Sequence, residues 1–439
     1  MAKVPGHIGM PIIGDRSLEF ANDSLKFVNN HIQKYGRIFQ SRLLNRQTIF
    51  LASYDAVQQL LNDTNGTYDM EYRYKALWGE NILHYNGNIN QLVQLTINAS
   101  NAFNFDPKLS YKEATRVKAV LGKCLDPDQL ARLCGPMIHK ILENLLGSLE
   151  HEKEVPLYTK FKQVASYITV CLFLGLDPGS THEIDSIIEL TTEHWHGLIS
   201  IPVSASFTGW STTFGKAIKA KDELIDRIEE LLCRFDKNEF NQTISNAGFK
   251  SREELRNHIL LFVSALPPKA VASLLASTFI ELGKTGHARY VDIARNDLDL
   301  LNAITTEIER LHPPFIGGKR QAIKGGVISG FTIPKGCSLL YLTHAAHRDP
   351  AAFPNPDQFL PERWLNDSNN RKIWTFGGGR RACVGRTLMK MMLQETISYV
   401  IKNYDWQFQS DVYNIKYKTL PVYRPDEEFY VKFTRRDNP

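Results

Sequence analysis

The sequence lacks the patterns that would indicate a membrane-spanning, a zinc-binding or a nucleic-acid-binding protein. It has no run of eighteen apolar residues, so no segment is predicted to span a bilayer. Its six cysteines form no CxxC pair and no zinc-type spacing, which favours reduced thiols in an intracellular compartment. The net charge of +5 is too small to indicate nucleic-acid binding, while a basic face for an acidic redox partner or an anionic membrane stays open.

What the chain does contain is enough apolar material for a large core, with 439 residues and 43% hydrophobic composition. Its hydrophobic periodicity is mostly helical, with short β-type runs. The pattern predicts helices over 55–62, 297–311 and 384–403, and strands over 47–51, 327–333 and 338–342. We therefore predict a single mainly α domain over 1–439, with a small β-rich part at about 1–100 and a helical part at about 101–439.

The stretch from Trp374 to Gly385 combines one cysteine, a glycine-rich loop and an arginine pair, directly before an apolar helical run. Glycines let backbone N–H groups approach a sulfur, Phe376 can shield that sulfur from water, and an arginine can neutralise a porphyrin carboxylate. These are the requirements of a buried iron–thiolate bond. The alternative is a structural cysteine in a glycine turn, which the number of constrained positions in so short a stretch disfavours.

The spacing Phe-x-x-Gly-x-Arg-x-Cys-x-Gly resembles the heme signature of the cytochrome P-450 superfamily, the heme-thiolate oxygenases. The resemblance implies that family's fold, a triangular helical domain with heme b between a distal helix and the helix that follows the cysteine loop. It implies that Cys383 is the axial iron ligand and that Arg381 binds a heme propionate. Arg320 has the spacing of a second propionate contact, and an ordinary surface arginine is the alternative.

By the same resemblance, Phe376, Gly377 and Gly385 belong to the cofactor-binding loop. The opening stretch 5–14, the segment 35–39 and the glycine-rich loop are most similar to the branch that includes sterol, retinoid and brassinosteroid hydroxylases.

Glu307 and Arg310 lie three residues apart on a predicted helix and therefore share one face. Such a pair alone is usually a solvated surface ion pair. Together with Arg363, in a Pro-Glu-Arg-Trp segment downstream, the pair resembles the family's charge triad, which holds the coil that presents the heme ligand. A buried charge triad is tolerated only when it is fully hydrogen-bonded, so each member should be needed for heme retention.

The sequence departs from the family on the predicted distal helix. Where the family has an acid followed by threonine, which relay protons to dioxygen, this chain has Leu266 and Pro267. The candidate catalytic segment is therefore atypical, and it comprises Ser264, Leu266, Pro267 and Pro268. Adjacent prolines inside a helix predict a kink with unpaired carbonyls; the alternative is a helix that ends and restarts. Lys269 is the one charge nearby; we expect it to face solvent or to be paired, and the alternative is a distal proton donor.

A second departure lies at Asn90 and Gln94, where the family usually has a basic His and Arg that hold a propionate and add positive charge to the reductase-docking face. Neutral amides can still bond a carboxylate, but they weaken docking by charge.

Both departures favour a heme-thiolate oxidoreductase that acts on a hydrophobic lipid-, hydroperoxide-, terpenoid- or sterol-like molecule through an atypical O–O step. The preferred form is a reductase-independent rearrangement of a hydroperoxide or a peroxide-driven oxidation. The main alternative is a conventional hydroxylase dependent on NADPH and a reductase. A third interpretation is a heme-binding relative with little turnover.

The expected partners are a hydrophobic small molecule, a redox partner such as a reductase, and a membrane surface contacted peripherally, but no nucleic acid. The predicted localisation is intracellular, either soluble or associated with an endoplasmic-reticulum-type membrane through an anchor upstream of 5–14. By analogy with the family, residues 68–85, 200–214 and 313–317 should border the substrate pocket; they are rich in aromatic and small residues, which suits an apolar ligand.

Overall fold

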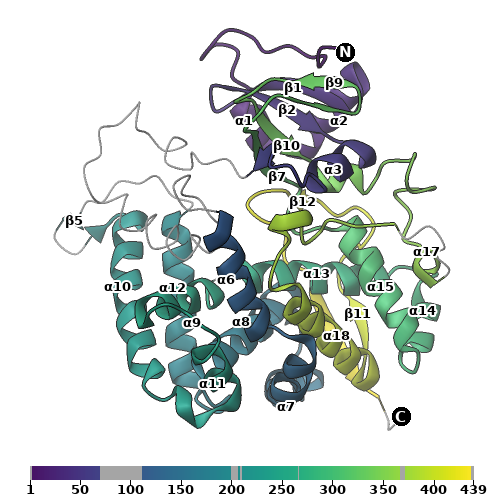
Figure 1. The fold of residues 1–439 in the computed structure, drawn as a ribbon. Coiled ribbons are helices and arrows are strands. Elements are labelled where there is room, and N and C mark those ends of the chain that lie inside the picture. Colours follow the sequence, from purple (N-terminus) through teal and green to yellow (C-terminus); the bar gives the residue numbers. More distant parts are fainter. Residues whose placement is uncertain are drawn as a thin grey trace. The chain divides into compact units, whose positions relative to one another are not determined.

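The computed structural model describes residues 2–69, 111–198, 206–207, 210–264, 266–365 and 371–436. The chain divides into two compact units, each assembled from separate stretches of sequence. We call the first the sheet unit: Met1–Tyr72, Ser273–Cys383 and Phe408–Phe429. The second is the helical unit: Arg73–Ala272, Val384–Gln407 and Tyr430–Pro439. Figure 1 shows their elements.

The sheet unit carries most of the described strands, together with helices such as α2 and α15. Its elements in chain order are α1 (Ser17–Asn22), α2 (Ser24–Tyr35), β1 (Ile38–Leu43), β2 (Arg46–Leu51), α3 (Tyr54–Leu61), β3 (Tyr68–Asp69), α14 (Ala288–Ala294), α15 (Leu298–Leu311), β7 (Gly318–Ala322), β8 (Gly326–Ile328), β9 (Phe331–Ile333), β10 (Ser338–Tyr341), α16 (Thr343–Ala346), α17 (Glu362–Leu365), the 3-10 turn η4 (Gly379–Arg381), β12 (Tyr417–Lys418) and β13 (Arg424–Pro425).

A five-stranded sheet in the order β1-β2-β10-β7-β3 organises this unit. β10 runs parallel to β2 and antiparallel to β7, so strands almost three hundred residues apart in the sequence become neighbours. Side chains alternate between the two faces because a strand repeats every two residues. Ile49, Leu51 and Leu339 pack in one apolar cluster, and Phe50 and Leu340 pack in another.

The turn between β1 and β2 consists of Leu44 and Asn45, which both have positive φ, 51° and 55°. Two consecutive left-handed residues are the conformation of a type I′ hairpin turn, whose twist matches that of the flanking strands. β1 and β2 therefore pair in register from Ile38 opposite Leu51 to Leu43 opposite Arg46.

The helical unit carries most of the long helices. Its elements are α6 (Tyr111–Cys124), α7 (Pro127–Leu146), η2 (Leu149–His151), β4 (Val155–Pro156), α8 (Leu157–Leu174), α9 (Thr181–Leu198), β5 (Ser206–Phe207), β6 (Trp210–Ser211), α10 (Thr213–Leu232), η3 (Phe235–Lys237), α11 (Glu239–Ser245), α12 (Arg252–Phe262), α18 (Arg386–Asn403) and β14 (Tyr430–Arg435). Two elements cross a unit boundary: α13 (Leu266–Leu282) and β11 (Tyr404–Phe408).

α8 is the central helix of this unit, since it is buried without interruption from Val164 to Leu174. A helix that is apolar on all sides has to be surrounded by protein or lipid. The stretch Arg252–Leu282, which contains α12 and α13, is long and apolar enough to cross a membrane, but 69% of its most apolar window is buried inside the protein. That burial is typical of a core helix.

The predicted elements agree well with the structure. The predicted helices over 55–62, 297–311 and 384–403 are α3, α15 and α18, and the predicted strands are β2, β8 with β9, and β10. The mainly α fold with a small β part is confirmed. The β part is not limited to the first hundred residues, because β7 and β10 complete the same sheet. The single domain over 1–439 stays a prediction.

Candidate functional site

The cysteine loop of the sheet unit is shaped by its own backbone hydrogen bonds. The Cys383 N–H donates to the Phe376 carbonyl at 2.8 Å, and the Gly377 N–H donates to the Trp374 carbonyl at 2.8 Å. Gly377 and Gly379 have φ of 67° and 61°, a left-handed conformation that glycine adopts without strain. The loop therefore folds back on itself and presents Cys383, which is exposed, at its end.

Glycine at position 379 is also required by close packing. A Cβ atom there would lie 2.0 Å from the carbonyl oxygen of Leu61 at the end of α3. A Cβ on Gly378 would lie 3.2 Å from both Leu61 and Trp374. The loop is thus fitted against α3 by backbone contact, which only glycines allow.

The chemistry of the six cysteines singles out this loop. Burial raises the pKa of the Cys124, Cys134 and Cys171 thiols to about 12, because desolvation penalises the thiolate. Those thiols are poor metal ligands as they stand. Cys383 and Cys233 are the two exposed cysteines, and Cys383 is the one in a glycine loop.

Glu307, Arg310 and Arg363 are brought together as the sequence predicted. The Arg310 guanidinium lies 2.7 Å from a Glu307 carboxylate oxygen, and both side chains are fully buried. Arg363 Nε reaches the same carboxylate at 3.2 Å. The structural role assigned to this charge triad stays a prediction.

The triad meets the condition for buried charge, because its hydrogen-bonding groups are satisfied. All five N–H groups of Arg310 are used: three donate to the carbonyls of His347, Pro356 and Gln358, and two donate to Glu307. The Glu307 carboxylate also accepts from the Leu360 N–H and from Trp364 Nε1. The triad therefore fixes the coil over 347–364 to α15.

His347 connects this coil to the cysteine loop, and the sequence did not point to it. Its Nε2 accepts from the Trp374 N–H at 2.8 Å, and its Nδ1 lies 3.2 Å from the Arg310 carbonyl oxygen. Burial lowers the pKa of His347 to about 3, so the ring is neutral with the proton on Nδ1. Thr375 adds a second link, since its hydroxyl donates to the Glu309 carbonyl at 2.6 Å.

Arg320 lies on β7 and is only 7% exposed, which excludes the alternative of an ordinary surface arginine. Its guanidinium stands 5.1 Å from the ring centre of Tyr341 and donates to the Lys319 carbonyl. The Tyr341 hydroxyl is in turn 3.9 Å from where a Cβ on Gly377 would be. Arg320 therefore lies beside the cysteine loop, where a cofactor carboxylate would need it. Arg381 is half-buried in η4, and binding of propionates by both arginines stays a prediction.

The distal segment differs from our prediction of a kinked helix. α12 ends at Phe262 with Val263 as its C-cap, and α13 begins at Leu266. Pro267 and Pro268 are the second and third residues of α13, where backbone N–H groups have no partner within the helix in any case. The prolines therefore start a helix at little energetic cost. Ser264 is half-buried between the two helices, and the side chain of Leu266 is outside the described residues.

Lys269 is paired with an aromatic ring, which agrees with the expectation that it faces solvent or is paired. Its ammonium group lies 5.2 Å from the ring centre of Trp195 on α9, within the helical unit. A cation held over an indole ring is engaged in a cation–π contact. The segment 260–272 contains no acidic residue. The catalytic assignment of Ser264, Leu266, Pro267 and Pro268 stays a prediction.

Asn90 and Gln94 lie outside the described residues, so their cofactor-binding roles stay predictions. Of the segments predicted to border the pocket, 313–317 is described in full, while 68–85 and 200–214 are described only in part.

The sequence analysis did not single out α6, which carries four basic residues in fourteen positions: Lys112, Arg116, Lys118 and Lys123. A helix with four basic residues therefore begins at Tyr111, seventeen residues after Gln94.

The residues of the loop fit heme. An exposed cysteine at the end of a glycine cradle can bind iron as a thiolate, and a buried arginine beside it can hold a carboxylate. Cys383 would hold the iron, with Arg320 and Arg381 at the propionates. When bound, heme supplies the redox chemistry that protein side chains lack.

The comparisons with known proteins agree with this site. The family description Cytochrome P450 matches residues 286–433, which include Glu307, Arg310, Arg363 and Cys383. Cytochrome P450 26A1 of Xenopus laevis is 22% identical over 98% of this chain and 89% of its own length. Beta-amyrin 28-monooxygenase of Medicago truncatula is 24% identical over 95% of this chain and 91% of its own.

The structure of retinoic acid-bound cyanobacterial CYP120A1 superposes with a TM-score of 0.79, at 23% identity, covering 99% of both chains. These matches confirm the resemblance to the cytochrome P450 superfamily, a family of heme-thiolate enzymes that bind heme b through a cysteine thiolate.

Proposed function

We propose that this protein oxidises an isoprenoid-type hydrophobic molecule, and that peroxide or a substrate hydroperoxide supplies the oxygen. Two of the similar proteins support the substrate class. The name of one relative includes β-amyrin, and the solved structure of another similar protein holds retinoic acid. Both compounds are large, apolar and built from isoprene units. The oxygen source is supported by the start of α13, where Leu266 and Pro267 replace the acid and the alcohol of the usual proton relay.

The observation that carries the oxygen step is the chemistry of these two side chains. Neither leucine nor proline can hold or pass a proton. A reaction that begins with dioxygen needs protons delivered before its O–O bond breaks, whereas a peroxide already contains the reduced O–O unit. A chain that keeps the cysteine loop but lacks the side chains of the usual relay therefore favours a peroxide-type substrate over dioxygen.

The test compares two oxidant systems on the heme-loaded full chain with retinoic acid and β-amyrin as probes. We expect product with hydrogen peroxide or linoleate hydroperoxide in the absence of reductase, at a rate above that with NADPH and a reductase. Robust NADPH-dependent oxidation together with no peroxide-driven turnover would contradict the proposal. Loss of both would support the heme-binding interpretation instead.

The second candidate is a conventional monooxygenase that depends on NADPH and a reductase. It is favoured by the monooxygenase names among the relatives and by α6, whose basic side chains suit an acidic redox partner. Replacing Leu266 by Glu and Pro267 by Thr restores an acid–alcohol pair. If the relay is what limits this chain, the double variant should gain reductase-dependent hydroxylation, and no gain would show that the relay is not limiting.

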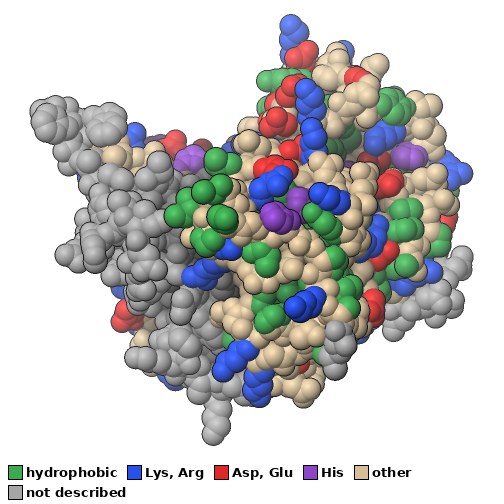
Figure 2. Space-filling view, turned by 90° about the horizontal axis from the view of Figure 1, so that it is seen from above, with side chains coloured by type: hydrophobic (Ala, Val, Ile, Leu, Met, Phe, Trp, Pro, Cys, Tyr) green, Lys and Arg blue, Asp and Glu red, His purple; other side chains and the backbone are tan. Residues whose placement is uncertain are grey.

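Peripheral membrane contact belongs to the same proposal, because an apolar substrate partitions into bilayers. The N-terminal segment carries Met10, Ile12, Ile13 and Leu18, which are 72–88% exposed. Figure 2 shows hydrophobic side chains gathered beside Lys and Arg on the face that it displays. Such exposed groups are typical of a membrane or partner contact. Co-sedimentation with anionic vesicles should fall when Ile12 and Ile13 are both replaced by Ser, and unchanged binding would contradict this contact.

A further inference from the structure

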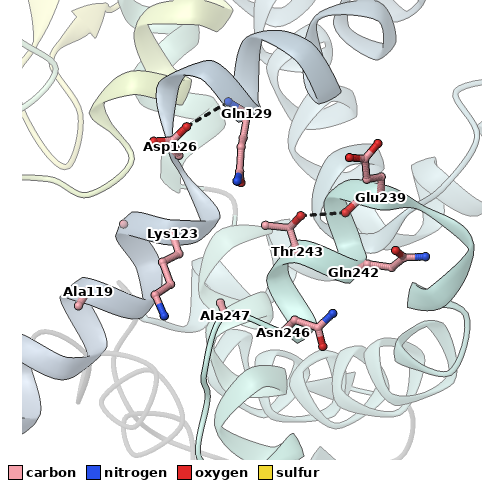
Figure 3. Close-up of a pocket in the computed structure, with 10 residues that line it drawn as sticks. Ala119, Lys123, Asp126, Gln129, Glu239, Gln242, Thr243, Asn246 and Ala247 are labelled. Carbon is pink, nitrogen blue, oxygen red and sulfur yellow. Dashed lines mark hydrogen bonds between the residues drawn. The ribbon is translucent and has the colours of Figure 1, made fainter.

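A groove separate from the cysteine loop lies within the helical unit, between α6, α7 and α11 (Figure 3). Its volume is about 640 Å³, within the range of small-ligand sites. Figure 3 shows Gln129 reaching from α7 into the space between Lys123 on α6 and Thr243 on α11. The lining residues are mostly small or polar and uncharged: Ala119, Gly122, Lys123, Asp126, Gln129, Glu239, Gln242, Thr243, Asn246 and Ala247.

Gly122 is the first sign that this groove holds a ligand. It lies inside α6, where glycine destabilises a helix relative to alanine. A Cβ at this position would meet no atom within 4 Å, and its φ is not in the left-handed region. Neither packing nor backbone conformation therefore requires glycine here. The bare backbone leaves room for something that approaches α6 from the groove.

Gln129 is the second sign. Its side-chain oxygen is buried and has no hydrogen-bond partner among the residues that the structure describes. A buried acceptor without a donor destabilises a protein. A ligand that presents an N–H group in the groove would satisfy this oxygen. Without a ligand, Gly122 and the unpaired Gln129 oxygen each lower the stability of the folded protein. A bound ligand would compensate for both.

The spacing of the remaining amides indicates the chemistry of that ligand. Gln242 lies on α11 and Asn246 is the C-cap of that helix four residues later, a spacing that corresponds to about 6 Å along a helix. An extended peptide repeats its outward N–H and C=O groups every two residues, about 6.7 Å. Side-chain amides both donate and accept, so a row of them matches a peptide main chain.

The charges in the groove select among peptides. Asp126 caps α7 by accepting from the Gln129 N–H, and Glu239 is paired with Arg132 at 2.6 Å. Lys123 is exposed and forms no ion pair in the part of the chain that the structure describes. We propose that this groove binds an extended peptide segment of a partner protein, with an acidic side chain of the peptide at Lys123.

The test uses the heme-loaded full chain and fluorescein-labelled hexapeptide libraries. One central position is fixed as Asp, Lys or Asn, and the other positions hold Ala, Ser, Thr or Val. Fluorescence anisotropy should show saturable binding of the Asp library, about tenfold tighter than that of the Lys library, since one charge-assisted bond gives a factor of this order. Lys123→Glu should reverse the preference, and Gln129→Ala should weaken binding of every library.

Gly122 supplies the decisive variants. Gly122→Ala should raise the unfolding midpoint by roughly one or two degrees, because alanine favours the helix. Gly122→Leu should fold and lose binding, because its side chain fills the groove. Gln33→Ala, an exposed amide on α2, is the matched control and should bind as the wild type does. Absence of binding by all three libraries, or equal binding by Gly122→Leu, would overturn the proposal.

Discussion

At the residue scale, the site depends on one fully bonded carboxylate. Glu307 accepts from two arginines, an indole and a backbone N–H, and it is fully buried. Its charge is balanced only while these donors stay in place. We therefore predict that the presentation of Cys383, more than seventy residues downstream, depends on a side chain that has no hydrogen bond to the cysteine loop.

Replacing Glu307 by Gln should lower the free energy of unfolding by about 3–5 kcal/mol, because two buried guanidinium groups would lose their counter-charge. Heme content per polypeptide should fall with it. Urea unfolding and the ratio of heme to protein absorbance measure both effects. Glu239→Gln is the matched control, because that carboxylate pairs with Arg132 at the same short range but is 60% exposed. A Glu307 variant as stable as this control would contradict the account.

A second residue-scale prediction concerns His347. Burial lowers its pKa to about 3 in the folded chain, against about 6.5 when unfolded. The unfolded state therefore takes up a proton first as the pH falls, and stability should decrease from pH 6.5 downward until the pH nears 3. This histidine alone should remove about 2 kcal/mol between pH 6.5 and 5.

Urea unfolding of His347→Gln at both pH values measures this contribution. The variant should lose part of the acid sensitivity, while His139→Gln, at a side chain that is 59% exposed, should keep all of it. An unchanged pH slope in His347→Gln would mean that the ring is not held neutral by burial.

At the element scale, the decisive feature is the restart of the distal helix. The sequence predicted prolines inside a helix, but the structure places them in the first turn of α13. Hydrophobic periodicity cannot distinguish these cases, because the apolar pattern continues across the break. Only the φ and ψ values at Val263 and the hydrogen bonds of α12 mark where one helix ends.

Pro267→Ala tests this placement. In the first helical turn, proline removes no backbone hydrogen bond, so the substitution should change the free energy of unfolding by less than about 0.5 kcal/mol. Chemical denaturation measures this directly. Stabilisation of about 3 kcal/mol would instead show that proline strains a continuous helix, as it does in a helix interior.

The elements also show which site residues could be predicted from the sequence. Glu307 and Arg310 were predictable because three residues on a helix define one face, and Arg363 because its Pro-Glu-Arg-Trp segment is recognisable. His347, Thr375 and Tyr341 were not, because their links to α15 and to the cysteine loop join residues that only the folded chain brings together. A contact over such separations leaves no local pattern.

At the scale of the whole molecule, each unit is assembled from distant stretches. β2 and β10 become neighbours in the sheet unit, and α7 and α18 pack in the helical unit although more than two hundred residues separate them. Long-range pairings of this kind depend on cooperative burial rather than on local propensity. The sequence could therefore predict the individual elements and the family, but not the composition of the sheet.

The central claim for the molecule is that Cys383 binds the heme iron as a thiolate. The optical spectrum of the reduced carbonyl complex tests it most directly, because a thiolate ligand on the iron would shift the main absorbance band far to the red. The wild type and Cys233→Ser, which alters the other exposed cysteine, should both show the shifted band. Cys383→Ser should lose it, and a Cys383→Ser variant that kept the shifted band would contradict the account.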